Sequence, residues 1–216
     1  TKIVFLANPN NPTGTMISAS EVRRLHAGLQ DNVLLVLDGA YAEYVGIADY
    51  EDGFGLVEET QNVVTTRTFS KIYGLAALRL GWAYCPEPIA AVINRLRGPF
   101  NVSTPAQLAG IAAIEDQAHV QASIKHNDVW RDRLFQQISG AGFEVLPRHA
   151  NFLLIKFDHE SGLSALQAEQ KLNERGLILR GLTAYGLPDA LRLTIGTEEA
   201  NKLVAEAFQE MAENNG

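Results

Sequence analysis

The sequence has little cysteine and no long apolar stretch. Its 216 residues include one cysteine, Cys85, so an internal disulfide is excluded. A chain without disulfides is typical of a reducing compartment, and we expect a cytoplasmic protein. Apolar runs reach only about five or six residues, far short of the ~20 residues that a membrane-spanning helix requires.

Positive charge is also scarce. The sequence has 18 Lys and Arg residues against 25 Asp and Glu residues, which gives a net charge of −7. Nucleic acids and membrane surfaces usually bind a basic face, so this balance argues against both as partners. Hydrophobic residues make up 46% of the chain, which is enough to form a core in one large domain or two small ones.

The first half of the chain contains four short apolar or β-branched runs that predict strands. They lie at residues 3–7, 33–37, 63–69 and 80–85. An unbroken run such as residues 33–37 is typical of a strand covered on both faces, as in a parallel sheet. A helix starting after Ser18 or Ser20 separates the first two runs, so the pattern predicts an α/β fold with a mostly parallel sheet.

The second half predicts longer helices and a smaller α+β unit. Helices are expected at residues 104–115, at about 119–139, where Gly140 and Gly142 end the helix, and at 165–175 and 198–214. Short strands are expected at residues 143–146, 151–157, 177–179 and 191–195. This change of character suggests a domain boundary between residues 1–120 and 121–216.

Polar side chains follow three successive predicted strands. An amide-rich turn at residues 8–14 follows the first strand, Asp38 and Tyr41 follow the second, and Ser70 and Lys71 follow the third. Open parallel sheets bind ligands beyond the carboxyl ends of their strands, so we expect these groups to meet at one edge. Each feature alone is ordinary: a turn, a helix cap, a packed ring or a solvated lysine. Their combination favours a binding site.

A carboxylate, a phenol and a lysine together suit pyridoxal phosphate. This cofactor needs an amine to form a Schiff base, an acid to keep its pyridine nitrogen protonated, and donors for its ring hydroxyl and phosphate. Burial and cationic neighbours would lower the pKa of the Lys71 amine, which could then act as nucleophile and as general base. We expect no metal site, because His119, His126 and His149 follow no metal-ligand spacing.

Five segments resemble the pyridoxal-phosphate aminotransferases of fold type I, class I/II. They are NPNNPTG (8–14), DGAY (38–41), TFSKIYGLAALRLGW (68–82), ANFLLIKF (150–157) and LRGLTAYGLPDALRLTIGT (179–197). The pairing of ILRGLTAYGLP with LRLTIGT is most similar to the histidinol-phosphate aminotransferase branch. The resemblance implies an aspartate aminotransferase-like fold, with residues 1–120 as the C-terminal part of the large cofactor-binding domain and 121–216 as the small domain.

The resemblance also implies roles at the cofactor. Lys71 would be the Schiff-base lysine and would move the proton between the substrate Cα and the cofactor. Asp38 would hold the pyridine nitrogen, and Tyr41 and Asn11 would donate to the ring hydroxyl. The implied phosphate contacts are Thr68, Ser70 and Arg79. A guanidinium suits this task, since it can hold two phosphate oxygens at once.

On the substrate side, the resemblance implies that Arg192 receives an anionic group. That group would be the phosphate of histidinol phosphate, which has no α-carboxylate. Arg180 matches a second substrate-side arginine of this branch, although a surface residue at a strand end is an equally good interpretation. Asn151 matches a position near the active site, and satisfying backbone groups at a strand start is its ordinary alternative.

The implied reaction is transamination of histidinol phosphate with 2-oxoglutarate in histidine biosynthesis, with aromatic amino acids as further candidate substrates. The same residues would serve a decarboxylase or a β-lyase, because the cofactor stabilises any carbanion at Cα. An alternative of another class is the effector domain of a transcription regulator built on an aminotransferase domain.

The resemblance implies more chain than the sequence contains. The sequence starts at Thr1 and enters a predicted strand at residue 3, so we expect the C-terminal part of a longer protein. The remaining segment would be present as a separate chain, would have been lost by proteolysis, or would have been left out of the residue numbering. The absent part would supply a helix N-terminus for the cofactor phosphate and a ring stacked on the pyridine. A homodimer partner would add a tyrosine. A sheet without its neighbouring strands would expose a hydrophobic edge.

Overall fold

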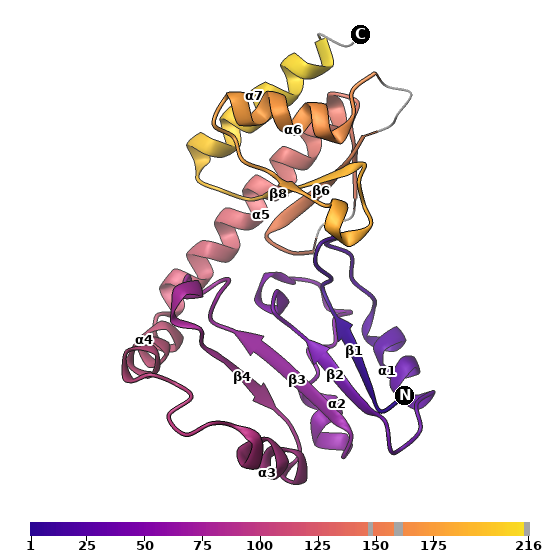
Figure 1. Cartoon of the computed structure of the whole chain (residues 1–216), viewed down its shortest axis with the longest axis vertical. Coiled ribbons are helices and arrows are strands. Elements are labelled where there is room, and N and C mark those ends of the chain that lie inside the picture. Colours follow the sequence, from indigo (N-terminus) through magenta and orange to yellow (C-terminus); the bar gives the residue numbers. More distant parts are fainter. Residues whose placement is uncertain (147–148, 158–161, 214–216) are drawn as a thin grey trace. The chain divides into compact units, whose positions relative to one another are not determined.

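The computed structural model describes residues 1–146, 149–157 and 162–213, which form two compact units. Unit 1 consists of Thr1–Asn10 and Met16–Ile124, and unit 2 consists of Asn11–Thr15 and Lys125–Gly216. Each unit is built on its own four-stranded sheet (Figure 1). Among the described residues, none of the helices is both long enough and apolar enough to span a membrane.

The sheet of unit 1 is mostly parallel. Its strands are β1 (Ile3–Ala7), β2 (Leu34–Asp38), β3 (Val63–Thr68) and β4 (Gly81–Tyr84), and they lie side by side in this order. β1, β2 and β3 run parallel, whereas β4 is antiparallel to β3 (Figure 1). Ala7 pairs with Asp38, and Asp38 pairs with Thr66. The carboxyl ends of three strands therefore reach the same edge, as the sequence predicts.

Two helices cover one face of this sheet. They are α1 (Ala19–Ala27) and α2 (Phe54–Glu59). The Ser18 side chain caps α1 by accepting a hydrogen bond from the Glu21 amide, which satisfies one of the free donors of the first turn. The shared core consists of Val22, Leu35, Leu37, Leu56, Val57 and Val63. Burying each such side chain contributes about 1.5–3 kcal/mol.

Both outer strands of the sheet carry exposed apolar side chains. Phe5 on β1 is 73% exposed, and all four residues of β4 are exposed. The helices α3 (Glu87–Leu96) and α4 (Thr104–Glu115) follow β4. No residue of α3 is buried. Gly110 on α4 approaches Phe69 and Leu80 so closely that an added Cβ would lie 2.5 Å from Leu80.

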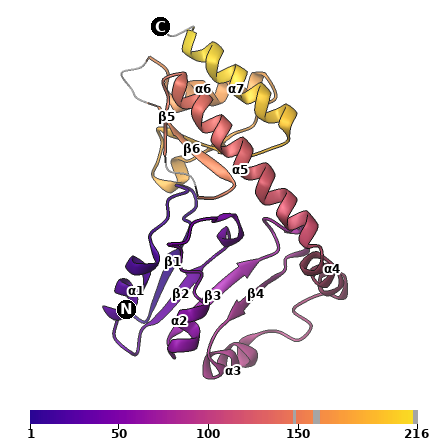
Figure 2. The ribbon, with the colours of Figure 1, turned by 180° about the vertical axis from the view of Figure 1, so that it is seen from behind.

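Unit 2 contains an antiparallel sheet with helices against it. The strands are β5 (Glu144–Val145), β6 (Phe152–Lys156), β7 (Arg180–Gly181) and β8 (Ala190–Thr194), in the spatial order β5-β6-β8-β7. The helices are α5 (Gln117–Gly140), which begins in unit 1, α6 (Ala165–Glu174) and α7 (Glu198–Glu213). In unit 2, α5 and α7 lie in front of the sheet in the view of Figure 2.

The core of unit 2 lies between these helices and β6. Leu134 and Ile138 of α5, Leu153 and Ile155 of β6, and Phe208 of α7 are all buried in one cluster. Leu153 and Ile155 are two positions apart, so they share one face of the strand. Leu154 points to the opposite face and packs with Leu182 and Ala190. β6 is therefore covered on both faces.

Three details of the sequence prediction differ from the structure. The predicted strand at residues 177–179 is wrong: β7 occupies Arg180–Gly181. Gly176 has a φ of +74°, and the Leu177 amide donates to Leu172 O at 2.9 Å, so this segment ends α6 instead of forming a strand. The helices α2 and α3 were not predicted. α3 has a proline in its first turn, where proline favours helix initiation although it ends strands.

Because Phe208 lies in the core of unit 2, we expect Phe208→Ala to lower the free energy of unfolding strongly. The Phe208 ring is fully buried and lies 5.1 Å from the ring of Phe143 and 6.4 Å from that of Phe157, between centroids. Truncation should leave a cavity and lower the free energy of unfolding by about 3–5 kcal/mol, measured by urea titration. Leu203→Ala on the exposed face of α7 is the control and should change it by only about 0.5 kcal/mol. Equal effects of the two substitutions would contradict this packing.

Candidate active site

Asp38 and Tyr41 lie at the end of β2 in unit 1. Asp38 is the last residue of the strand, and its carboxylate is exposed. Its Oδ1 accepts a hydrogen bond from the Ala40 amide at 3.1 Å, while the Gly39 amide donates to Thr66 O at 3.1 Å. Tyr41 is buried and precedes the short 3-10 helix η1 (Ala42–Tyr44). These two hydrogen bonds fix the backbone that directly follows Asp38.

Lys71 follows β3 and lies beside Tyr41. Its Nζ is 5.4 Å from the centroid of the Tyr41 ring, within the range of a cation–π contact. Phe69 and Ile72 are buried on either side of Lys71, and the Gly74 amide donates to Lys71 O at 2.9 Å. The backbone is thus anchored, while the amine itself is exposed. This arrangement presents a lysine amine to a ligand.

Thr68, Ser70 and Arg79 lie together near this lysine in the sequence and in the fold. The Ser70 amide donates to Thr68 Oγ1 at 3.0 Å. The Arg79 guanidinium donates to Ser70 Oγ at 3.5 Å and to Ala76 O at 2.8 Å. No carboxylate of the described chain forms an ion pair with Arg79, so its positive charge remains available to an anion.

The backbone of Arg79 is strained. It adopts the left-handed conformation, with φ 53° and ψ 46°, at the end of the short helix η2 (Ala76–Leu78). This region costs a residue other than glycine about 1–2 kcal/mol. Such strain occurs preferentially at ligand sites, where surrounding structure enforces it. It supports a binding role for Arg79.

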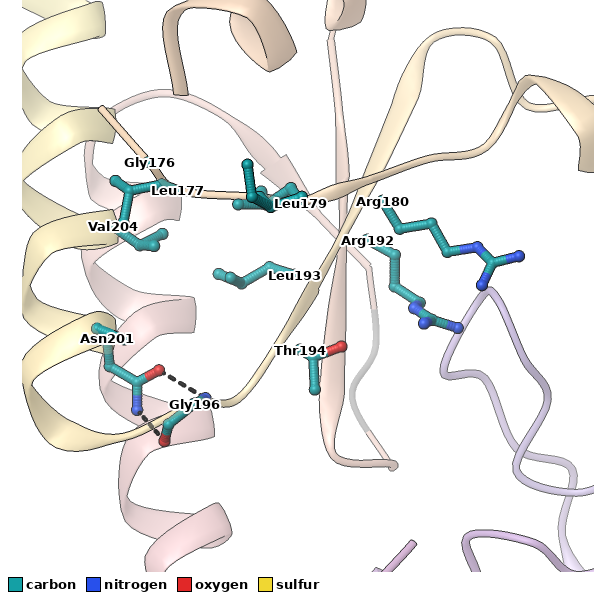
Figure 3. Close-up of a pocket in the computed structure, with 12 residues that line it drawn as sticks. Gly176, Leu177, Leu179, Arg180, Arg192, Leu193, Thr194, Gly196, Asn201 and Val204 are labelled. Atoms are coloured by element: carbon teal, nitrogen blue, oxygen red, sulfur yellow. Dashed lines mark hydrogen bonds between the residues drawn. The ribbon is translucent and has the colours of Figure 1, made fainter. Parts of the chain in front are cut away.

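Unit 2 places Arg180 and Arg192 directly opposite one another. The two residues are partners in the register of β7 and β8, and both side chains extend from the same side of these neighbouring strands (Figure 3). Like charges at such a cross-strand pair are destabilising. In the ranges that the structure covers, no carboxylate forms an ion pair with either arginine. The pair therefore favours a bound anion.

Neutral groups hold both guanidinium groups. Arg192 packs 4.9 Å above the Phe152 ring and donates to Asn11 Oδ1 at 2.5 Å, while its Nε is buried without a hydrogen-bond partner among the described residues. Arg180 donates to the Tyr185 hydroxyl at 3.2 Å and packs on the same ring. These contacts orient the side chains and leave their charge unneutralised.

A cavity of about 510 Å³ in unit 2 has Arg180 and Arg192 among its lining residues, although both side chains extend away from Leu193 and Val204 (Figure 3). Its apolar wall includes Leu179, Leu193 and Val204. At one end, the Asn201 side chain holds both the amide and the carbonyl of Gly196, at 2.9 and 3.0 Å (Figure 3).

Two predicted site residues have different surroundings from the others. Asn11 belongs to unit 2 and contacts Arg192 there; its predicted contact with the cofactor stays a prediction. Asn151 accepts a hydrogen bond at its backbone carbonyl from the Ile195 amide, at 2.9 Å. This bond continues the pairing of β6 and β8, which agrees with the ordinary role of a residue at a strand start.

Sequence reasoning missed a buried polar group behind Asp38. Arg67 on β3 is only 7% exposed and lies 3.8 Å from the Glu43 carboxylate. Burial raises the pKa of the Glu43 carboxyl, although the nearby Arg67 charge opposes this shift. Burial also raises the pKa of Tyr50, whose hydroxyl donates to Asn8 O at 2.7 Å. Arg67 lies two positions after Thr65 and four after Val63, so the three side chains share one face of the strand. A charged residue on the same face as these two was the signal available in the sequence.

Several known proteins are similar to this chain in sequence. The histidinol-phosphate aminotransferase of Rhodopseudomonas palustris (strain BisA53) is 57% identical over 210 residues, which are 97% of this chain and 58% of that protein. The enzyme of the same name from Nitrobacter winogradskyi is 56% identical over the same shares of both chains. The chain thus spans about 58% of the length of these relatives.

Solved structures of related proteins are similar to this chain in fold. The crystal structure of histidinol-phosphate aminotransferase from Sinorhizobium meliloti in complex with pyridoxal-5'-phosphate matches with a TM-score of 0.88 and 28% identity, over 100% of this chain and 58% of that one. L-threonine-O-3-phosphate decarboxylase from Porphyromonas gingivalis shares the fold, with a TM-score of 0.82 at 22% identity over 98% of this chain and 65% of that one. The fold class implied by the sequence resemblance is confirmed.

A comparison with models of protein families shows the family to which the chain belongs. The family model of aminotransferase class I and II matches residues 1–208. This match covers nearly the whole chain, and its range includes Asp38, Lys71 and Arg192. The chain therefore belongs to the aminotransferase class I and II family.

Proposed function

We propose that the protein is a pyridoxal-phosphate-dependent aminotransferase that acts on histidinol phosphate, with 2-oxoglutarate as the amino acceptor. The products would be imidazole acetol phosphate and glutamate. The name shared by relatives at 55–58% identity supports this reaction. The structural observation that carries the proposal is the exposed amine of Lys71, held over the Tyr41 ring at the edge where Asp38 ends its strand.

The described residues fit the proposed cofactor. Pyridoxal phosphate has an aldehyde, a basic ring nitrogen and a phosphate, and unit 1 offers a partner of matching chemistry for each: the Lys71 amine, the Asp38 carboxylate and the Arg79 guanidinium. The unpaired charge and strained backbone of Arg79 support its role toward the phosphate. Thr68 and Ser70 would add hydroxyl groups to that site. When bound, the cofactor supplies an electron sink for charge that develops at the substrate Cα.

In this proposal Lys71 has two tasks. Its amine would hold the cofactor covalently through the aldehyde, and as a free amine it would act as the base that moves the proton at the substrate Cα. Tyr41 lies under the amine and would limit its motion, as well as donate to the ring hydroxyl. Asp38 would hold the proton on the pyridine nitrogen. Asn11 stays a predicted donor to the ring hydroxyl, and Asn151 a predicted substrate contact.

The two arginines of unit 2 would select the substrate. A phosphate dianion has enough charge and enough oxygen atoms for two guanidinium groups, whereas a carboxylate satisfies one. Phe152, Asn11 and Tyr185 orient Arg192 and Arg180 without neutralising them. This arrangement supports a phosphorylated substrate over a simple amino acid. Assays of 2-oxoglutarate-dependent transamination and of decarboxylation would separate the two reactions that these residues could serve.

We further propose a cytoplasmic homodimer in which residues 1–120 belong to the cofactor-binding domain and residues 121–216 to the small domain. The single cysteine supports a reducing compartment. Exposed apolar side chains such as Trp82 on β4 and Ile111 on α4 support an association surface. Small-molecule amine and oxo-acid partners follow from the proposed reaction.

The proposed role of Lys71 can be tested by the absorbance of the bound cofactor. The full-length protein with added pyridoxal phosphate should show the visible absorbance band of the covalently bound cofactor, and Lys71→Ala should lack it because it removes the amine that lies over the Tyr41 ring. Lys202→Ala is the matched control, since Lys202 is an exposed lysine on α7 paired with Glu198; it should keep the band. A Lys71→Ala variant that keeps the band would refute the assignment.

The proposed role of Arg180 in phosphate recognition can be tested by steady-state kinetics. Arg180→Gln removes a charge but keeps a hydrogen-bonding side chain, so the KM for histidinol phosphate should rise roughly 10- to 100-fold, as expected for a charged hydrogen bond worth about 1.5–3 kcal/mol. The kcat should change less, and turnover of histidinol, which has no phosphate, should hardly change. Arg175→Gln is the control, because Arg175 is exposed and paired with Glu210. An equal loss with both substrates would contradict phosphate recognition.

A further inference from the structure

A buried arginine lies directly behind the turn that carries Asp38. The Arg67 guanidinium donates from Nη1 to Thr65 Oγ1 at 3.0 Å and to Thr66 O at 3.1 Å, and from Nη2 to Asp52 O at 3.0 Å. It also packs 5.0 Å from the centroid of the Phe54 ring. One side chain thus connects β3 to the segment before α2.

The same guanidinium fills the space beside Gly39. A Cβ added to Gly39 would lie only 1.9 Å from Arg67 Nη1, so residue 39 must be glycine as long as Arg67 occupies this position. The Thr66 carbonyl accepts from both the Gly39 amide and Arg67 Nη1, each at 3.1 Å. The turn between Asp38 and Tyr41 therefore rests on the arginine through close contact and through a shared acceptor.

A buried guanidinium is costly unless its donors are satisfied and a counter-charge lies near. Arg67 makes three hydrogen bonds through its Nη atoms, and two carboxylates lie near, with Glu43 Oε1 3.8 Å from its Nε and Asp52 Oδ2 4.0 Å from its Nη2. Glu43 belongs to η1, directly after Tyr41 and Ala42. The ion pair therefore holds the far end of the same turn. Arg67 therefore contacts this segment at Gly39, between Asp38 and Tyr41, and at Glu43, two residues after Tyr41.

We propose that Arg67 is a positioning residue that fixes the Asp38 carboxylate and the Tyr41 phenol at the end of β2. It touches neither the reacting atoms nor the cofactor in this account. It acts through Gly39, which directly follows Asp38, and through Glu43, two residues after Tyr41. The inference rests on the proposed function, because the position of Asp38 matters for the reaction only if that carboxylate meets the cofactor.

The test compares Arg67→Met, Arg67→Lys and Gly39→Ala in the full-length protein. Arg67→Met keeps a long side chain but loses every donor, and Gly39→Ala keeps Arg67 but displaces its guanidinium. Arg23→Met is the control, since Arg23 is a half-exposed arginine of unit 1 that pairs with Glu51 and Glu59. The measurements are visible circular dichroism of bound pyridoxal phosphate, its dissociation constant, kcat and KM, and hydrogen exchange of the Gly39 and Ala40 amides without cofactor.

We expect Arg67→Met and Gly39→Ala to lose amide protection at residues 39 and 40 and to weaken the visible dichroism. Their kcat should fall roughly tenfold or more, as for a misplaced catalytic group, with little change in KM. Arg67→Lys should recover part of each signal, and Arg23→Met should match the wild type. Gly39→Ala should cost less in the Arg67→Met background, because the clash is gone and the two sites are coupled.

Normal amide protection and normal dichroism in folded Arg67→Met, with only a lower melting temperature, would overturn the proposal. If Arg67→Met does not fold, Gly39→Ala decides by the same criteria. A wild-type protein without the cofactor band would instead contradict the proposed function. The amide protection needs no cofactor and would still decide the role of Arg67.

Discussion

The parallel pairing of β1, β2 and β3 is the constraint on which the candidate site depends. The register pairs Ala7 with Asp38 and Asp38 with Thr66, so the chain leaves all three strands at one edge. A slip by one residue would turn every side chain to the opposite face. Buried Leu35 and Leu37 prevent this slip, because their partners in the core lie on one face only. Core packing thus determines where Asp38 and Lys71 lie.

The arginines considered above fall into two groups according to their partners. Arg79, Arg180 and Arg192 are held by hydroxyl, carbonyl, amide and ring groups, so their charge remains available for anions. Arg67 and Arg23 face carboxylates instead and serve the fold. Carboxylate partners would have neutralised the first group and weakened phosphate binding. Among these five arginines, those proposed to bind ligands have neutral partners and those that serve the fold have acidic ones.

Local patterns in the sequence predicted the elements with strong local signals. The strand at residues 33–37 was predicted from its unbroken apolar run, and the helix Thr104–Glu115 from a stretch dominated by Ala, Leu, Ile and Gln. The role of Arg67 and the contact of Arg192 with Asn11 could not be predicted, because folding brings together residues that are far apart in the chain. The latter pair is separated by 181 positions. Roles at the site came from resemblance, and they stay predictions.

The central claim is that Lys71 is the amine that binds the cofactor. Borohydride reduction of the full-length protein with bound pyridoxal phosphate would fix the cofactor to its lysine, and peptide mass spectrometry would locate it. Trypsin does not cleave at a modified lysine, so the account predicts that the cofactor mass is found on one peptide, residues 68–79, between cleavage after Arg67 and cleavage after Arg79. A label on another lysine, or an unlabelled peptide ending at Lys71, would contradict it.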